Sequence, residues 1–281
     1  MKRQVAEAMV KDHRLSIRRA CQIVRLSRAA YYRTPQAPME RDREVIEALQ
    51  RVVEDHPRWG FWKCYDRLRL IGHRWNHKRV YRVYCELKLN VPRRAKRRIP
   101  QRLRQPLAAP AVLNGTWALD FMHDALYGGR RFRTLNVLDE GNRQGLAIEV
   151  GTSIPSTRVV RVVEQLIEVY GRPAAIRVDN GPELTAQALV EWCDRHTIEL
   201  RYIQPGKPDQ NAYIERFNRS YREEVLSAYV FESLEQVRAL TDEWLQTYNE
   251  ERPHDSLGRV PPLTFMPRPN RPVESGYRVS T

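Results

Sequence analysis

The sequence lacks the features of secreted, membrane-spanning and zinc-ribbon proteins. Its four cysteines (Cys21, Cys64, Cys85 and Cys193) form no CxxC pair, so we expect reduced, mostly buried thiols. No apolar run approaches the length of a membrane span, and the N-terminal MKRQVAEAMVKDHR has no apolar stretch like that of a signal peptide. We therefore expect a cytoplasmic protein with no membrane partner.

Acidic residues are scarce in the first 110 residues. This part holds 28 Lys and Arg against 10 Asp and Glu, whereas residues 111–281 hold 20 against 24. The whole excess behind the net charge of +14 therefore lies in the N-terminal part. This asymmetry predicts a polyanion-binding N-terminal part and a near-neutral catalytic part. Because RNA-binding proteins can show the same asymmetry, it indicates nucleic acid without indicating which kind.

Residues 1–36 are predicted to form a helix-turn-helix region. Within RLSIRRACQIVRLSRAAYYR, apolar residues recur at helical spacing, and Ser27 can cap a second short helix that carries Arg28 and Arg33. The second helix of such a motif can enter a major groove of DNA. An ordinary helical hairpin is the alternative.

Residues 40–92 are predicted to form a second helical DNA-binding region. An amphipathic helix is expected first, and a helical pair follows whose second helix is capped by Asn76. Its polar face carries Lys78, Arg79 and Arg82. His73 and His77 are four residues apart, but no third ligand is spaced to complete a zinc site, so a surface or phosphate-contacting role is favoured.

Residues 93–112 are predicted to be a basic linker. Its first part, RRAKRRIPQRLR, is rich in basic residues and has no acidic one. Contacts with DNA phosphates require charge but no regular structure. We expect such contacts from Arg93, Arg94, Lys96, Arg97 and Arg98; a plain solvated linker is the alternative. The proline-rich segment 268–281 is predicted to be a loosely held tail.

Residues 113–267 show the pattern of an α/β domain. Three strands are expected first, and then a helix, a strand, a helix, a strand and a helix. This is the order of the ribonuclease-H-like fold, an α/β fold with a five-stranded mixed sheet and flanking helices. In that fold the first and fourth strands are neighbours, and ligands gather at the strand ends of open α/β sheets.

Three carboxylates are candidates for a catalytic metal site. Asp120 and Asp179 each end a short apolar run, and Glu215 lies in the predicted helix NAYIERFNRSYREEV. Delivered from neighbouring strands and a helix, they can hold two divalent cations about 4 Å apart, an arrangement that promotes attack on phosphodiesters. Oxygen ligands favour two magnesium ions, with manganese as a substitute.

Other carboxylates compete with these three. Asp124 and Glu183 each lie four residues beyond a candidate, and Asp139 ends the second strand. We rank them lower because the second strand points elsewhere in this fold and because Glu183 is expected to open a helix, where an acid complements the dipole.

Basic residues near the predicted site are candidate phosphate contacts. Arg222 lies nearly two helical turns beyond Glu215, and Arg219 lies between them; a surface charge face is the alternative for both. Lys207, between Gly206 and Pro208, precedes this helix and could reach the substrate.

The segments WALDF, RVDNGPE and GKPDQNAYIERFNRSYREEV resemble the catalytic blocks of DDE transposases. With YNEERPHDSLGRVPPLTF they resemble the second-frame product (OrfB) of the IS-three family of bacterial insertion sequences, relatives of retroviral integrases. The resemblance covers residues 14–267. It implies that Asp120, Asp179 and Glu215 bind the metal ions and that Arg222 is the family's basic residue.

The resemblance implies a transposase that cleaves 3′ ends of an insertion sequence and transfers them to target DNA. Its expected partners are the terminal repeats, target DNA, further copies of the chain on DNA, and a first-frame (OrfA) protein, separate or fused, in the bacterial cytoplasm at the nucleoid. A DNA-binding regulator with an inactive integrase-like domain and a simple metal-dependent nuclease are the alternatives.

Overall fold

The computed structural model describes residues 2–32, 38–91, 112–204 and 211–268. The chain divides into two compact units, Met1–Ala48 and Leu49–Thr281. Within the described ranges no helix has the length and apolar character needed to cross a bilayer.

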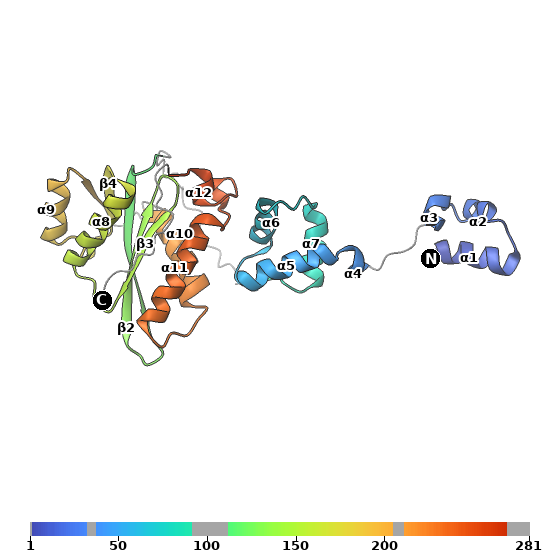
Figure 1. The fold of residues 1–281 in the computed structure, drawn as a ribbon, viewed down its shortest axis with the longest axis horizontal. Helices are drawn as coiled ribbons and strands as arrows, with labels where there is room; N and C mark the ends of the chain where they lie inside the picture. Colours follow the sequence, from blue (N-terminus) through green and yellow to red (C-terminus); the bar gives the residue numbers. More distant parts are fainter. Residues whose placement is uncertain (1, 33–37, 92–111, 205–210, 269–281) are drawn as a thin grey trace. The chain divides into compact units, whose positions relative to one another are not determined.

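Three short helices open the first unit (Figure 1). They are α1 (Lys2–His13), α2 (Ile17–Ile23) and α3 (Arg28–Tyr32). The Ser27 hydroxyl accepts a hydrogen bond from the Ala30 amide at 3.2 Å, so the predicted cap of the second motif helix is confirmed. Helix α1 was not predicted, because its sequence is mixed in polarity and buries only Ala6.

Four further helices precede the α/β domain. They are α4 (Pro38–Arg41), α5 (Arg43–Asp55), α6 (Phe61–Leu70) and α7 (His77–Glu86). The side chain of Asn76 accepts a hydrogen bond from the Lys78 amide at 2.9 Å, which confirms the predicted start of the last helix. The helix expected near residue 40 is confirmed as two pieces, α4 and α5.

The α/β domain contains the predicted five-stranded mixed sheet. Its strands are β1 (Thr116–Ala125), β2 (Arg131–Asp139), β3 (Gly145–Gly151), β4 (Ala175–Val178) and β5 (Glu199–Tyr202). They lie in the order β3-β2-β1-β4-β5, with β1 antiparallel to β2 and parallel to β4. The predicted neighbours, the first and fourth strands, are therefore adjacent, and the ribonuclease-H-like fold is confirmed.

The register of β1 and β4 brings two candidate residues to the same level of the sheet. Ala118 pairs with Arg177, and β4 ends at Val178. Continued by two residues, this register places Asp120 opposite Asp179. The pairing of parallel strands thus positions side chains that are far apart in the sequence.

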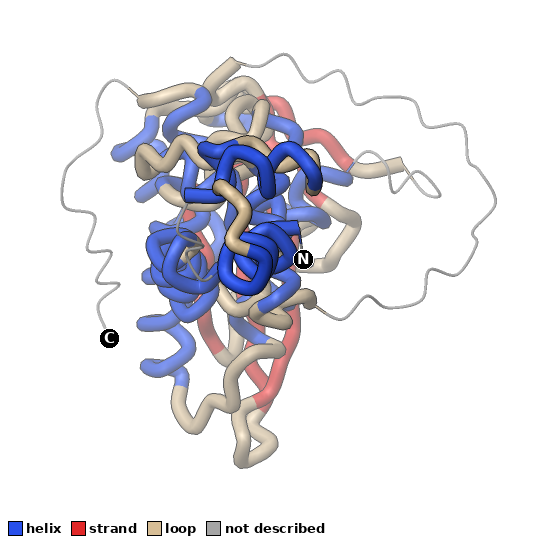
Figure 2. Tube along the Cα trace, turned by 90° about the vertical axis from the view of Figure 1, so that its right-hand side faces the viewer, coloured by secondary structure: helices blue, strands red, loops and turns tan. Residues whose placement is uncertain are grey.

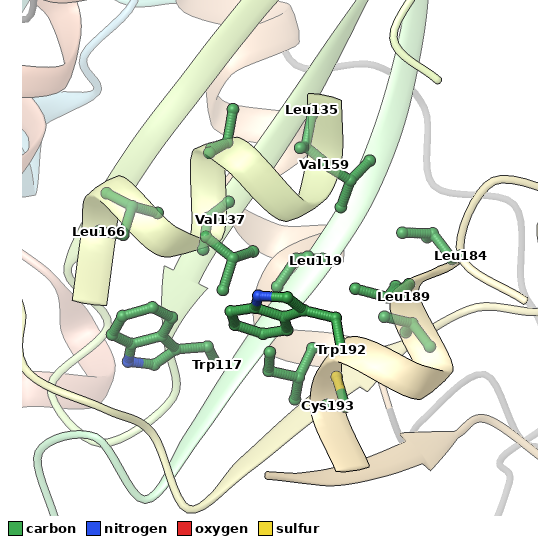
Figure 3. Close-up of a cluster of buried hydrophobic side chains, with 14 of the residues drawn as sticks. Trp117, Leu119, Leu135, Val137, Val159, Leu166, Leu184, Leu189, Trp192 and Cys193 are labelled. Atoms are coloured by element: carbon green, nitrogen blue, oxygen red, sulfur yellow. The ribbon is translucent and has the colours of Figure 1, made fainter. Parts of the chain in front are cut away.

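Helices cover both faces of the sheet, because successive β1 side chains point to opposite sides. Helices α8 (Ser156–Tyr170) and α9 (Gln187–Arg195) pack on the face that carries Trp117 and Leu119, where Trp192 of α9 joins the buried cluster (Figure 3). The other face packs against helices α10 (Ala212–Tyr221) and α11 (Leu234–Glu250). The second cluster includes Ala118, Met122, Ile214, Phe217 and Tyr221.

The remaining elements are η2 (Arg222–Leu226), η3 (Asp255–Leu257) and α12 (Pro262–Phe265). Element η2 is a π-helical turn that continues α10, so the predicted single helix changes its winding at Arg222. Ile214, Phe217, Tyr221 and Val225 are all buried, as predicted from their spacing.

The helix predicted from Pro182 begins later, at Gln187. The amides of Leu184 and Thr185 donate to the Gly181 carbonyl in a turn, and Ala186 has extended backbone angles that interrupt a helix. The expectation that Glu183 opens a helix was therefore wrong.

The β1–β2 hairpin turns at residues 126–130. Both views show this turn below the helices of the α/β domain, at the bottom of the picture (Figure 1, Figure 2). The Leu126 amide donates to the Arg130 carbonyl at 2.9 Å, and the Gly129 amide to the Leu126 carbonyl at 2.8 Å. Gly129 has φ +80°, a conformation that glycine adopts without strain.

Candidate active site

Asp120 lies in the middle of β1 with both carboxylate oxygens hydrogen-bonded. Its Oδ1 accepts a hydrogen bond from the Phe121 amide at 2.8 Å. Its Oδ2 accepts one from the side-chain amide of Asn218 on α10, at 2.7 Å. The side chain is therefore fixed from its own strand and from the covering helix.

Asn218 is itself held by a second buried amide. Asn136 on β2 donates to Oδ1 of Asn218 at 2.6 Å, and both side chains are buried. A chain of amides thus links β2, α10 and Asp120. Sequence reasoning missed Asn136 and Asn218; the signal for Asn218 was a polar residue within the apolar stripe of a helix, three residues after Glu215.

Asp179 follows β4 directly and begins a tight turn. Its Oδ1 accepts a hydrogen bond from the Gly181 amide at 3.0 Å. The next side chain, Asn180, donates to the carbonyl of Ile203 at 3.2 Å, beyond the end of β5. Asn180 therefore ties together the two segments that follow β4 and β5, a structural role that keeps the Asp179 turn in place.

Glu215 lies exposed in the first turn of α10. Burial is the main reason that the pKa of Asp120 is raised to about 6, and the negative charges of Asp179 and Glu215 raise it further, against the opposing hydrogen bonds from Phe121 and Asn218. Asp179 and Glu215 are therefore both within electrostatic reach of Asp120.

The predicted sharing of metal ions by these three residues stays a prediction. Among the residues that the structure describes, no three His, Cys, Asp or Glu side chains are arranged to hold a metal ion. Both carboxylate oxygens of Asp120 accept hydrogen bonds, and the side chain of Glu215 is exposed. The structure thus shows a negative cluster rather than a formed metal centre.

Each competing carboxylate is paired with an arginine. Asp124 pairs with Arg222, Glu183 with Arg133, and Asp139 with Arg268. The hydrogen bond from Arg133 is the main reason that the pKa of Glu183 is lowered. All three competing acids therefore take part in ion pairs, and the helix argument for the lower rank of Glu183 was wrong.

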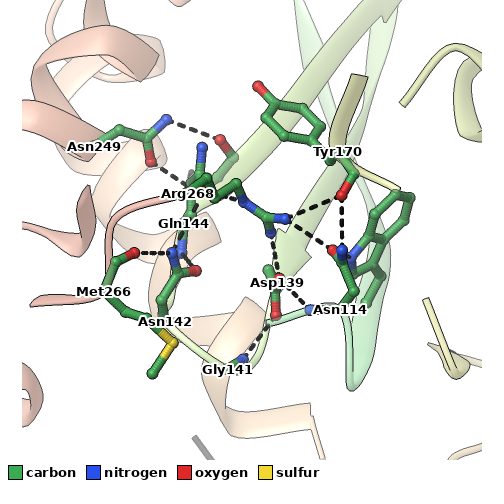
Figure 4. Close-up of polar contacts among 11 residues, drawn as sticks. Asn114, Asp139, Gly141, Asn142, Gln144, Tyr170, Asn249, Met266 and Arg268 are labelled. Atoms are coloured by element: carbon green, nitrogen blue, oxygen red, sulfur yellow. Dashed lines mark hydrogen bonds and ion pairs between the residues drawn. The ribbon is translucent and has the colours of Figure 1, made fainter. Parts of the chain in front are cut away.

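Arg268 closes a buried polar network at the far end of β2 (Figure 4). Its guanidinium pairs with Asp139 and donates to Gln144 at 2.7 Å and to Asn114 at 2.9 Å. The side chains of Arg268 and Asp139 are 6% and 0% exposed. Arg268 therefore belongs to the α/β domain, so the predicted start of a loose tail at 268 moves at least one residue later.

Arg222 does not lie free on the surface. It pairs with Asp124 and donates to the carbonyl of His123 at 2.7 Å, so its guanidinium lies along β1, past Asp120. Arg219 is exposed on α10. Lys207 lies outside the described residues.

The other predicted DNA contacts lie in the helical regions. Arg28 and Lys78 are exposed at the starts of α3 and α7. Arg82 pairs with Glu86 at 3.0 Å, and Arg79 is half-buried. The remaining ones, Arg33, Arg93, Arg94, Lys96, Arg97 and Arg98, lie outside the described residues.

Three protein-family models match the chain. Two are described as integrase core domains and match residues 112–208 and 196–262. The third is described as an HTH-like domain and matches residues 40–97. The integrase matches together span all three candidate carboxylates, and the HTH-like match spans helices α5 to α7.

Proteins of insertion elements are similar along most of the chain. A 39.2 kDa protein of insertion element IS476 from Xanthomonas euvesicatoria is 40% identical over 94% of this chain and 76% of its own length. A 31.7 kDa protein of insertion element IS407 from Burkholderia multivorans is 38% identical over 89% of this chain and 90% of its own length.

Among solved structures, the integrase catalytic core domain of HTLV-2, in complex with magnesium, aligns with a TM-score of 0.42 and 18% identity. The alignment covers 54% of this chain and 96% of that domain.

Proposed function

Because the chain belongs to the IS-three family of insertion-sequence transposases, of the OrfB type, we propose that it cleaves DNA at the 3′ ends of an insertion sequence and transfers these ends to target DNA. The observation that carries the proposal is geometric: the pairing of β1 with β4 brings Asp120 and Asp179 to one level of the sheet, and Asp120 contacts α10, the helix that carries Glu215. Three carboxylates from β1, the end of β4 and the start of α10 create a local negative potential beside the sheet.

The donor set of this cluster fits magnesium. Asp120, Asp179 and Glu215 supply the hard oxygen ligands that magnesium prefers, and they would hold two ions, with manganese as an alternative. When bound, magnesium supplies activation of the attacking oxygen and charge stabilisation at the leaving oxygen.

The surrounding residues would hold this cluster in position. Asn218 fixes one oxygen of Asp120, and the Gly181 amide fixes one oxygen of Asp179. The hydrogen bond from Asn218 favours the charged form of Asp120, which is the form that binds cations. Because each amide restrains its carboxylate, only Glu215 on its exposed helix turn would need to adjust when ions bind.

The proposed reaction is a hydrolysis followed by a direct transesterification. In cleavage, the oxygen of water bonds to phosphorus and loses a proton to solvent, the bond from phosphorus to the 3′ oxygen breaks, and that oxygen takes up a proton from solvent to become the 3′-hydroxyl. In transfer, the freed 3′-hydroxyl attacks a target phosphodiester in the same way, without a covalent protein intermediate. Chain residues therefore orient the substrate and the cations but do not become the nucleophile.

The helical regions would supply DNA binding. Arg28 on α3 and Lys78 on α7 are exposed, and the first 110 residues carry the positive excess of the chain. We propose that these regions contact the terminal repeats and target DNA through phosphates and grooves. The active form would be an oligomer on DNA, with a first-frame partner that is separate or fused.

An oligonucleotide assay tests the proposal. The wild-type chain, alone and with its first-frame partner, is incubated with a labelled terminal-repeat duplex and magnesium, and hydrolysed and joined products are separated. Joined products that disappear in Asp179→Asn but persist in Asp194→Asn, a matched exposed acid on α9, support a transposase. Hydrolysis without joining would identify a simple nuclease, and DNA binding without either product would identify a regulator.

A further inference from the structure

The end of the β1–β2 hairpin presents large exposed side chains. Tyr127 is 81% exposed, and the neighbouring segment adds Tyr229 at 50% and Val230 at 74%. The turn also presents Arg130 and Arg131, both exposed. We call these five residues the hairpin-tip surface.

The backbone beneath this surface is firmly held. The Tyr127 amide donates to the Phe231 carbonyl at 2.7 Å, which ties the turn to the segment before α11. Leu126, Phe132 and Phe231 are buried in the second hydrophobic cluster. Because the backbone of the turn is already fixed, binding of a partner to these side chains costs little backbone conformational entropy.

The arginines of the hairpin-tip surface differ from their neighbours. Arg133 stacks on Phe121 on one face of the sheet and pairs with Glu183, and Arg222 pairs with Asp124 on the opposite face. Arg130 and Arg131 form no ion pair within the described ranges. Nearby Glu235 lies 3.8 Å from Arg238. Backbone and Ser233 hydrogen bonds lower the pKa of Glu235, and the charges of Arg238 and Arg130 lower it further, so Arg130 lies near this acid without forming an ion pair with it. The surface therefore combines two exposed guanidinium groups outside ion pairs with exposed aromatic rings, a combination suited to the phosphates and sugars of DNA.

The position of the surface connects it to the candidate active site. Tyr127 follows Asp120 by seven residues along the hairpin, which corresponds to about 23 Å in an extended strand. Helix α10 and its continuation follow the same course, since Asn218 contacts Asp120, Arg222 pairs with Asp124, and Phe231 accepts from Tyr127. Successive phosphates of a B-DNA strand advance by about 3.4 Å, so the surface would meet DNA about seven base pairs from the reacting phosphate.

We propose that the hairpin-tip surface binds the DNA duplex that flanks the reacting phosphate, with Arg130 and Arg131 on backbone phosphates and Tyr127 against the sugar and base edges of a groove. This inference rests on the proposed function, because that function places DNA at Asp120. A second copy of this chain is the competing occupant, and the experiments below distinguish it.

Cross-linking tests the location directly. A photoreactive phenylalanine derivative replaces Tyr127 in the full-length chain that also carries Asp179→Asn, so that the readout needs no catalysis. With a terminal-repeat duplex, we expect cross-links centred about seven base pairs from the element end. The same probe at Phe265, an exposed aromatic residue on α12, is the control and should not mark that position. Cross-links to a second copy in place of DNA would overturn the proposal.

Binding measurements test the chemistry. Replacing Arg130 and Arg131 together by alanine should weaken binding about tenfold and flatten the slope of log affinity against log salt by about two, since each phosphate contact contributes about one. Arg161→Ala, a single exposed arginine on α8, should leave the slope nearly unchanged. Tyr127→Ala removes no charge, so it should weaken binding severalfold without changing the slope.

The outcomes separate this inference from the proposed function. If the wild-type chain joins DNA but the hairpin variants bind DNA with unchanged affinity and the probe at Tyr127 gives no cross-link to DNA, only the inference fails. If the wild-type chain binds DNA and cross-links at Tyr127 but never cuts or joins it, the proposed function fails and the DNA-binding surface stands. Circular dichroism of the variants at Tyr127, Arg130 and Arg131 checks that each substitution leaves the fold intact.

Discussion

Acidic side chains at two places in the same sheet have opposite surroundings. Asp139, at the end of β2, is fully buried and receives hydrogen bonds from Asn114 and Gly141 as well as the ion pair with Arg268. Asp120 and Asp179 are half-buried, and no arginine or lysine of the described residues pairs with either. An acid whose charge is matched by an arginine supports the fold, whereas neighbouring acids without such a partner retain the potential to attract cations.

The largest expected effect comes from breaking the cluster of unmatched acids. Asp179→Asn keeps the shape of the side chain but removes a charge, so joining of DNA in magnesium should fall on the order of a thousandfold or more. Because the change also relieves repulsion with Asp120, the urea midpoint should stay the same or rise. Single-turnover joining assays and urea unfolding measure the two effects. Unchanged joining would contradict the site assignment.

Breaking the matched pair should instead affect stability. Arg268→Met leaves the Asp139 carboxylate buried without its cation, which should cost about 3–5 kcal/mol of unfolding free energy. The double variant Arg268→Met with Asp139→Asn should recover part of this loss, because the unpaired charge is gone. Urea unfolding of the three proteins measures the coupling. A single variant as stable as the wild type would show that the network does not support the fold.

Asn218 is the neutral partner of Asp120. Asn218→Ala removes the hydrogen bond to Oδ2 and should lower joining by about 10- to 100-fold, because groups that orient a ligand residue have effects of this size. The acid limb of the joining pH profile should also move to higher pH, since this hydrogen bond lowers the pKa of Asp120. A purely structural role would leave that limb in place. Ser220→Ala, on the same helix, is the control.

The smallest expected effect concerns a buried base rather than an acid. Burial, and then Arg252, lower the pKa of His254 from its usual 6.5 to about 3. Below pH 6.5 the unfolded chain binds a proton that the folded chain does not, so this group makes the fold less stable as pH falls toward 3. From about pH 7 to about pH 5 the contribution is about 2 kcal/mol. The free energies of unfolding of the wild type and of His254→Gln are measured at both pH values. The advantage of the wild type over the variant should shrink by this amount between about pH 7 and about pH 5.

The sequence predicted the elements whose signals are local. Alternating and helical patterns identified all five strands and helix α8, and Ser27 and Asn76 identified helix starts through cap chemistry. The three candidate carboxylates could be selected because strands one and four are neighbours in the fold that this order of elements indicated. The structure confirms that arrangement through the pairing of β1 with β4.

The parts that the sequence did not predict depend on distant contacts. Arg222 was assigned to DNA phosphate, but its partner Asp124 lies 98 residues away, and the π-helical turn at this point has no periodic signal. Arg268 was placed in the predicted tail because the prolines of that segment suggest a loosely held chain. Its hydrogen-bond partners lie far away in the sequence, at Asn114 and Gln144. Such pairings follow from the packed fold, so no local pattern reports them.

The chain of side-chain amides from Asn136 through Asn218 to Asp120 also sets the rotation of α10, the helix that carries Glu215, about its own axis. An α-helix rotates by about 100° for each residue, so a slip of α10 by one position would swing Glu215 away from the aspartates. Asn218 can reach both Asn136 and Asp120 in only one such alignment. Two buried amides therefore fix the rotation of α10 about its axis and, with it, the side of the helix on which Glu215 lies.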